Sequence, residues 1–262
     1  MTTAGSLPIS AAIIAHNSAP HLQRALASVD FCQERLVLDS GSTDGSIDLA
    51  LETGARVEHQ TFLGYGPQKQ AAVALANHDW ILSLDTDECL DEEARAAILK
   101  LDLSDPRACY ALRRRTFIGG REMCHGPWAR ERLLRLFNRT TANFSPLEVH
   151  EQVLSQQRPT LLPGSILHAS FSDCSDVIRR SLRYAPLKAR ILRRQHETAA
   201  AWTLPLRGGA MFLKSYLLQG GWRDGAGGFV VAVGRALDST LPRAMVLMLE
   251  DRTENPREII SP

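Results

Sequence analysis

The stretch DWILSLDTDECLDEEA, residues 79–94, joins an apolar run to a dense group of carboxylates. The run WILSL, Trp80–Leu84, has the length and composition of a buried strand. Acidic residues follow it at once: Asp85, Asp87, Glu88, Asp91, Glu92 and Glu93. Because like charges repel, such a group is costly unless something positive binds there or the chain has reached solvent. The stretch therefore predicts a buried strand that ends at a ligand site or at the surface.

Similar apolar runs occur upstream, and each is followed by a helical pattern. The strand patterns are Ile9–Ala15, Arg35–Asp39, Arg56–His59 and Asp79–Asp85. The helical patterns are His21–Val29, Ser46–Glu52, Pro67–Ala76 and Asp91–Leu101, the last with acidic residues at its start. Strands that are apolar on both faces and alternate with helices indicate a parallel sheet covered on both sides. The predicted fold class is therefore α/β, with a Rossmann-like, mostly parallel sheet.

The pattern changes after Pro106. Two further strand patterns, Ala108–Arg115 and Arg132–Asn138, are separated by an irregular, Gly-rich segment, and from about Asp176 the chain is helical and basic. We expect a division into residues 1–172 and a helical C-terminal region, residues 173–262. The composition, 44% hydrophobic and 23% charged, is typical of a soluble globular protein. Scattered cysteines without a CxxC pair, and an N-terminus without a signal-peptide pattern, favour a cytoplasmic location.

Charge is distributed unevenly along the chain. Residues 1–105 hold 6 Lys/Arg against 16 Asp/Glu, a balance of −10, whereas residues 106–262 hold 24 against 13, a balance of +11. An acidic first part suits a metal ion, and a basic second part suits phosphates or an anionic membrane. Two ordinary solvated surfaces are the alternative. Nucleic acid is not expected as a partner, because the basic residues lack interleaved aromatic residues and no nucleic-acid motif is present.

Polar side chains follow three of the predicted strands. His16 and Asn17 follow the first strand, Asp39 ends the second, and Asp85 and Asp87 end the fourth. Ligands of open parallel sheets bind beyond the carboxyl ends of the strands, so these groups are expected along one edge. The DTD pair can share Mg²⁺ or Mn²⁺, which prefer oxygen ligands and are completed by substrate phosphates. Each residue alone could instead be a helix cap or a turn residue.

The order IIAHN, LDSGSTDGS, GPQKQAAVALA and DWILSLDTDE resembles the family 2 glycosyltransferases of the GT-A fold. RLLRLFNR, VHE and ILHAS look like the branch of lipopolysaccharide core β-1,4-glucosyltransferases. The resemblance covers residues 8 to about 172. It implies an inverting transfer from a nucleotide-sugar, most readily a UDP-sugar, to a glycan or glycolipid acceptor in lipopolysaccharide or envelope polysaccharide biosynthesis. The first part of the chain would then be the nucleotide-sugar-binding, catalytic domain.

The resemblance also implies roles for single residues. His16, Asn17 and Asp39 would line the nucleotide pocket, and Lys69 would lie near the diphosphate. Asp85 would contact the ribose or the metal, and Asp87 would bind the metal. The sequence departs from the commoner pattern at His16, where Tyr is frequent, and at Ser40, where a second Asp is usual; both departures concern the nucleotide base.

Inverting transfer needs one general base that removes the proton of the acceptor hydroxyl. The candidates are Glu151 in VHE, Glu131 and Glu148. We favour Glu151 because it lies in a motif of the resemblance. The alternative for Glu151 is a surface ion pair with Arg132 or Arg135. His168 is either a further metal ligand or a polar residue at a strand end.

The segment 176–196 carries seven Lys/Arg and one acidic residue. Apolar residues share a face beside them, so the segment either rests peripherally on an anionic membrane or packs on the domain as solvated helices. Two other functions are alternatives for the whole chain. A sugar-1-phosphate nucleotidyltransferase would carry a Gly-rich basic loop after the first strand, which AHNSAPHL is not. A non-catalytic nucleotide-sugar-binding module would not need Asp85, Asp87 and Glu151.

Overall fold

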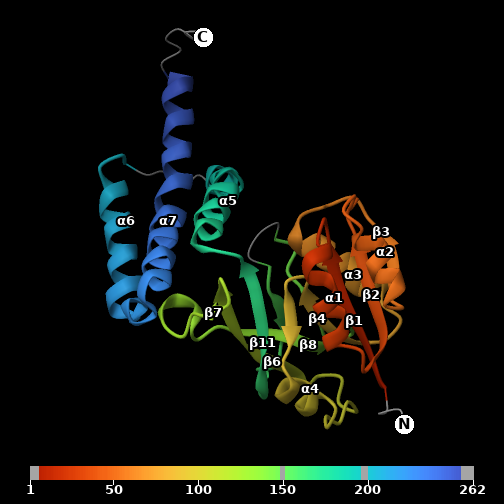
Figure 1. The fold of residues 1–262 in the computed structure, drawn as a ribbon. Coiled ribbons are helices and arrows are strands. Elements are labelled where there is room, and N and C mark those ends of the chain that lie inside the picture. The colour runs from red at the N-terminus through yellow and green to blue at the C-terminus, as the bar shows by residue number, and fades with distance from the viewer. Residues whose placement is uncertain (1–5, 148–150, 196–199, 255–262) are drawn as a thin grey trace. The chain divides into compact units, whose positions relative to one another are not determined.

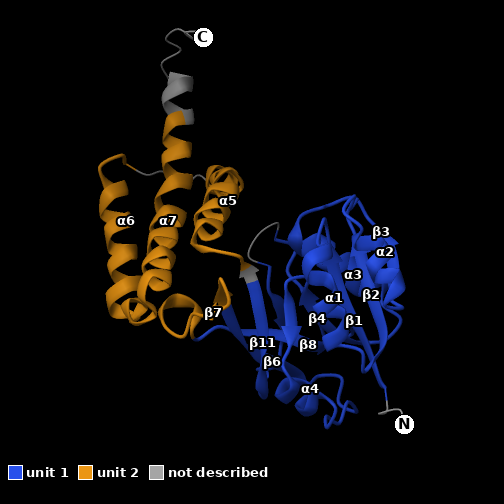
Figure 2. Ribbon diagram, viewed as in Figure 1, with its two compact units in different colours: residues 1–116, 130–170 blue, residues 117–129, 171–262 orange. Residues whose placement is uncertain are grey.

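The computed structural model describes residues 6–147, 151–195 and 200–254 of the chain. The chain forms two compact units (Figure 2). Unit 1 consists of residues 1–116 and 130–170, and unit 2 of residues 117–129 and 171–262. The segment 117–129 therefore belongs with the C-terminal residues, although a division at 172/173 would place it in the first part.

A mixed sheet forms the centre of unit 1 (Figure 1). Among the described residues its strand order is β3-β2-β1-β4-β8-β6-β11-β5, with β7 beside β6. The bounds are β1 Leu7–Ala15, β2 Cys32–Asp39, β3 Arg56–His59, β4 Trp80–Asp85, β5 Glu88–Leu90, β6 Cys109–Ile118, β7 Arg121–Glu122, β8 Arg132–Asn138 and β11 Thr160–Phe171. Strands β3, β2, β1 and β4 are parallel, and β8 pairs with both β4 and β6 in the antiparallel sense. A separate hairpin joins β9, Ala142–Phe144, to β10, Val153–Ser155.

Helices cover both faces of the parallel strands. The bounds are α1 Ala19–Ser28, α2 Ser46–Glu52, α3 Tyr65–Leu75 and α4 Glu92–Ile98. Ile13 of β1 belongs to the core cluster that contains Leu22 and Leu26 of α1, whereas its neighbour Ala12 belongs to the cluster that contains Val73 of α3. Successive side chains of a strand point to opposite faces, so one apolar run fills both cores. The predicted α/β class, with a parallel part covered by helices and a helical C-terminal region, is confirmed.

Helices dominate unit 2. The bounds are η1 Gly126–Trp128, α5 Cys174–Arg194, α6 Thr203–Leu213, the π-helical turn η2 Lys214–Leu218, η3 Gly221–Asp224 and α7 Gly225–Glu254. Helix α7 packs against both α5 and α6 (Figure 1). The described helices include none that is long and apolar enough to cross a bilayer.

The segment 117–129 contributes to the core of unit 2. Ile118 and Met123 are buried together with Val177 of α5 and Val231 of α7. His125 reinforces this packing, because its backbone N–H donates to Asp224 Oδ2 at 2.8 Å and its Nδ1 lies 2.8 Å from Asp224 Oδ1. The segment is thus an integral part of unit 2.

Candidate functional site

The carboxyl ends of β1, β2 and β4 meet at one edge of the sheet. In the strand register Ala15 lies beside Asp39, and Ile14 lies beside Asp85. His16, directly after β1, is therefore at the same edge. The predicted convergence of the three strand ends is confirmed, and we call this region the carboxyl-end edge.

Asn17 joins the loop after β1 to the loop after β2. Its backbone has a φ of 47°, a left-handed conformation that Asn tolerates better than most residues. The Asn17 side-chain oxygen accepts a hydrogen bond from the Thr43 backbone N–H at 2.9 Å, and the Asn17 N–H donates to Ser42 Oγ at 2.8 Å. His16 is exposed beside it. Asn17 thus shapes the loop pair, and His16 is the neighbour that remains accessible to a ligand.

Asp39 is almost completely buried and faces its own loop. Its Oδ2 accepts hydrogen bonds from the Gly41 N–H at 2.7 Å and the Ser42 N–H at 3.0 Å. Burial would raise the pKa of Asp39, but the hydrogen bonds from Ser42 and Gly41 outweigh it and lower the pKa. Asp39 is therefore a carboxylate that holds the 39–43 turn in place.

Lys69 of α3 lies at the centre of the carboxyl-end edge. Its side chain is only 4% exposed, and its Nζ lies 2.7 Å from Asp85 Oδ1 and 2.8 Å from Glu151 Oε1. Arg135 Nη2 donates to the other oxygen of Asp85 at 3.0 Å. Burial would raise the pKa of Asp85, but the adjacent Lys69 and Arg135 hold it far below its usual range. Asp85 is thus an ionised carboxylate between two cations.

Arg135 extends this network through buried groups. It donates to Glu88 Oε2 at 2.7 Å, and Arg114 Nη1 lies 3.3 Å from Glu88 Oε1. Arg114 also pairs with Glu131, Nη2 to Oε2, at 2.7 Å. Burial would lower the pKa of Arg135, but Glu88 and Asp85 raise it, so the guanidinium stays charged. The network alternates positive and negative groups, which is the usual condition for burying charges.

Sequence reasoning missed Glu88, Arg114 and Arg135 as members of the site. One signal was available: Arg135 lies two residues before the buried Phe137, and a strand places alternate residues on the same face. An arginine whose side chain lies on the buried face of a strand needs a buried acidic partner.

The candidate bases Glu151 and Glu131 both have partners in the structure, Lys69 and Arg114 respectively, while Glu148 lies outside the described residues.

Asp87 and His168 meet beyond the end of β4. His168 Nε2 lies 3.4 Å from Asp87 Oδ2, and His168 Nδ1 lies 3.3 Å from Thr116 Oγ1. The Ala169 N–H donates to the Asp87 carbonyl at 3.1 Å, which ties the DTD turn to β11. His168 lies within β11, opposite Glu88, and not at a strand end.

The Asp87–His168 pair fits a divalent cation as a partial ligand set. Two neighbouring ligands of an octahedral cation, each at 2.0–2.1 Å, lie roughly 3 Å apart, close to the observed separation. Within the described part of the chain, no group of three or more His, Cys, Asp or Glu side chains is arranged to hold a metal. Mg²⁺ is commonly held by one or two carboxylates, with waters and substrate phosphates as its other ligands.

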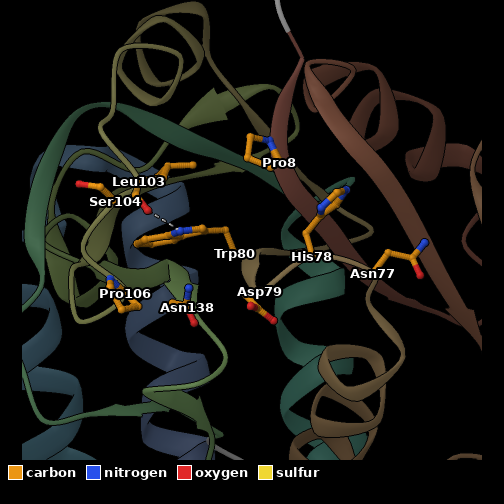
Figure 3. A pocket seen from close by; sticks show the side chains of 9 residues that line it. All are labelled: Pro8, Asn77, His78, Asp79, Trp80, Leu103, Ser104, Pro106 and Asn138. Atoms are coloured by element: carbon orange, nitrogen blue, oxygen red, sulfur yellow. Dashed lines mark hydrogen bonds between the residues drawn. The ribbon is translucent and has the colours of Figure 1, made fainter.

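A cavity of about 450 Å³ lies at the opposite edge of the sheet (Figure 3). It is lined by Pro8, Asn77, His78, Asp79, Trp80, Leu103, Ser104, Pro106 and Asn138. Pro8 and Trp80 stand at the beginnings of β1 and β4, and Trp80 Nε1 donates to the Leu103 carbonyl at 2.9 Å. The cavity is therefore separate from the carboxyl-end edge, where the polar strand ends gather.

The chain belongs to the glycosyl transferase family 2, because residues 10–155, more than half of its length, match the model of that family. It is thus a glycosyltransferase, and the nucleotidyltransferase and non-catalytic alternatives are set aside. It is 29% identical over 248 residues to the lipopolysaccharide core biosynthesis glycosyltransferase LpsC of Rhizobium meliloti, covering 92% of each chain. It is 26% identical over 260 residues to an uncharacterized glycosyltransferase of Rickettsia typhi, covering 94% of this chain and 89% of the relative.

Solved structures show a partial likeness. Glucosyl-3-phosphoglycerate synthase from Mycobacterium tuberculosis, crystallised with Mn²⁺, uridine diphosphate and glucosyl-3-phosphoglycerate, is 23% identical with a TM-score of 0.33. The likeness covers 42% of this chain and 43% of that one. A likeness of this size carries no statement about the ligands of the present protein.

Proposed function

We propose that this glycosyltransferase moves a hexosyl group from a nucleotide-diphospho-sugar, most readily a UDP-sugar, to a hydroxyl of a glycan or glycolipid, with inversion. The observation that carries the proposal is the carboxyl-end edge, where Lys69 and the Asp87–His168 pair offer two separate means of binding a diphosphate. The similarity to LpsC over nearly the whole chain supports an acceptor in lipopolysaccharide or a related envelope polysaccharide.

The donor would bind across the ends of β1, β2 and β4. The loop pair built on Asn17 and Asp39 would receive the nucleoside beside His16, and Lys69 would contact the diphosphate. Asp87 and His168 would hold Mg²⁺ or Mn²⁺, with Asp85 kept ionised nearby. The cation, when bound, neutralises the diphosphate and stabilises it as a leaving group.

Glu151 would accept the proton of the acceptor hydroxyl. Lys69 pairs with Glu151 and with Asp85 at the same time, at 2.8 and 2.7 Å. A diphosphate is a stronger competitor for an ammonium group than a single carboxylate, because it carries more charge. Donor binding would therefore draw Lys69 toward the phosphates and leave Glu151 with acceptor capacity for the hydroxyl proton.

The proposed reaction takes place in the cytoplasm, with the enzyme held peripherally at the inner face of the cytoplasmic membrane. A glycolipid acceptor would be presented there, and the excess of basic residues after residue 106 favours an anionic surface. The proposal requires contact with the bilayer and no insertion across it.

Calorimetric titration of a nucleotide-sugar panel, with and without Mn²⁺, tests the donor assignment. The wild-type protein should bind a UDP-sugar only with the metal, and Asp87→Ala should lose that metal-dependent binding. Asp48→Ala, which removes an exposed carboxylate of α2, is the matched control and should bind like the wild type. Unchanged metal-dependent binding by Asp87→Ala would overturn the metal assignment.

A further inference from the structure

Residues 202–223 of unit 2, which include α6, η2 and most of η3, present large apolar side chains to solvent. The exposed ones are Trp202, Leu206, Leu213, Leu217, Leu218 and Trp222, and we call this set the α6 face. Leu218 is 84% exposed and Trp202 is 71% exposed. Single exposed apolar residues are ordinary on protein surfaces, but a set gathered on one short segment marks an interaction surface.

The α6 face follows the helical repeat. Residues 202, 206 and 213 recur at intervals of four and seven, the spacing of one side of an α-helix, and Leu217 and Leu218 follow in the π-helical turn η2. The other side of α6 already has a partner, because Phe212 packs edge-to-face on Phe229 of α7 with ring centroids 5.6 Å apart. Gly208 also lies against Thr240 of α7. Helix α6 is thus apolar on two sides, and α7 covers one of them.

The charged residues of this segment all have one sign. Residues 202–223 contain Arg207, Lys214 and Arg223, all exposed, and no Asp or Glu. The next residue, Asp224, is buried and bonded to His125, so it does not offset them at the surface. The α6 face therefore combines exposed apolar groups with cations alone.

Helix α5, the basic segment that the sequence suggested for membrane contact, differs from α6. Its most buried residues, Val177, Ser181, Ala185 and Ala189, recur every four residues. Ser181 Oγ donates to the Gly234 carbonyl of α7 at 3.4 Å, and Lys188 pairs with Asp238 of α7 at 3.1 Å. This side of α5 is thus occupied by α7, and the larger exposed apolar set belongs to α6, η2 and η3.

We propose that the α6 face docks on a lipid bilayer that contains anionic lipid. Tryptophan prefers the interface between water and acyl chains, and Trp202 and Trp222 stand at the two ends of the set. Long basic side chains such as Arg207 and Lys214 keep their charges among the headgroups while their stems lie along apolar surface. A second copy of the chain is a poorer occupant, since a two-fold contact brings the same patch against itself and would oppose cations without any acidic partner. The inference rests on the proposed function, because a glycolipid acceptor lies in a bilayer.

Vesicle flotation tests the docking surface. The full-length protein is mixed with vesicles of phosphatidylcholine alone or with phosphatidylglycerol added. The double variant Leu217→Asp/Leu218→Asp should lower binding to the anionic vesicles by at least about tenfold, since each substitution removes an apolar side chain that the bilayer would bury. The control, Leu51→Asp/Leu154→Asp, alters two leucines of unit 1 with 56% and 58% exposure and should bind like the wild type. Arg207→Gln and Lys214→Gln should each lower binding by about fivefold.

The outcomes separate the rival occupants. Equal binding by the α6-face variant and the wild type would overturn the proposal, as would failure of the wild type to bind anionic vesicles. Light scattering without vesicles that shows a dimer, lost in the α6-face variant, would identify a second copy as the occupant and also overturn it. Nucleotide-sugar binding is measured on the same samples. Vesicle binding without donor binding would refute the proposed function and leave the docking surface standing.

Discussion

The carboxyl-end edge of unit 1 and the α6 face of unit 2 depart from the usual distribution of side chains in opposite ways. At the edge, Lys69, Glu88 and Arg135 are charged groups that are almost completely buried. On the α6 face, Leu217 and Leu218 are apolar groups that are exposed. Both arrangements are unfavourable by themselves, and different interactions offset them.

The buried charges of unit 1 have their partners within the fold, so the edge is organised before any ligand binds. The apolar groups on the α6 face lack cover from the described residues and gain it only from a separate partner. The edge is thus a region whose charges are balanced internally, whereas the α6 face is completed only by association. Substitutions at the carboxyl-end edge and substitutions on the α6 face should therefore change different measured properties.

The largest expected effect concerns the proposed base. Glu151→Gln keeps the shape of the side chain and removes its basicity, so transfer should fall by roughly two to four orders of magnitude. Donor affinity should not fall, because the proposed donor contacts come mainly from the first 105 residues and Lys69 loses its competing pair with Glu151. Single-turnover transfer and donor binding are recorded separately. Glu131→Gln is the matched comparison, since Glu131 also pairs with a cation, Arg114; an inactive Glu131→Gln beside an active Glu151→Gln would assign the base to Glu131.

The next effect concerns stability. Arg135→Met leaves the buried Glu88 without its closest cation, which should lower the free energy of unfolding by about 3–5 kcal/mol. Arg132→Met removes an exposed arginine of the same strand and should change it by less than about 0.5 kcal/mol. Denaturant titration of both variants gives the comparison. Equal stabilities of the two variants would show that the buried network contributes little.

The pH dependence of stability follows from Asp85. Its pKa in the folded protein lies far below the unfolded value of about 3.9. A depressed pKa contributes stability above the unfolded value, and the contribution is lost as pH falls toward the folded value. The difference in unfolding free energy between wild type and Asp85→Asn should therefore be constant from about pH 5 to 8 and shrink below about pH 4. A difference that changed mainly between pH 6 and 8 would point to another titrating group.

The smallest expected effect belongs to the α6 face. Without lipid, Leu217→Asp should change the unfolding free energy by no more than about 0.5 kcal/mol, because Leu217 is already 53% exposed. Leu22→Ala, at a fully buried site of α1, should cost about 2–5 kcal/mol. Thermal or denaturant unfolding distinguishes the two. A large loss of stability in Leu217→Asp would mean that the leucine is covered in solution.

The parts of the fold that were predictable depend on local periodicity. The four parallel strands and the helices between them follow from apolar runs alternating with helical spacing, and the shared edge follows from parallel direction alone. Asp91 illustrates the same point, since its side chain caps α4 by accepting from the Ala94 N–H at 2.8 Å, as the acidic start of the helix indicated. These features need no knowledge of distant residues.

The parts that were missed depend on tertiary partners. Strand β11 contains Pro163 and Gly164, which usually argue against a strand. Gly164 has a φ of 80°, and a side chain there would collide with the Ala94 backbone. The glycine therefore allows the backbones of β11 and α4 to approach closely. Likewise, the pairing of His168 with Asp87 and of Arg135 with Glu88 joins residues that are far apart in the chain. A single sequence shows the residue types but not which of them meet. The roles of the site residues stay predictions.

The composition of unit 2 from two chain segments has a consequence for protein production. A truncation at residue 172 would remove Val177 and Val231, the core neighbours of Ile118 and Met123, and leave these two apolar residues uncovered. Such a fragment would carry exposed apolar surface, which favours aggregation. In the antiparallel register, Arg113 of β6 lies opposite Arg132 of β8, and the Arg114 N–H donates to the Glu131 carbonyl at 3.0 Å. A short turn could therefore replace residues 117–129 and join the two strands directly, which gives a shorter recombinant protein that retains the carboxyl-end edge.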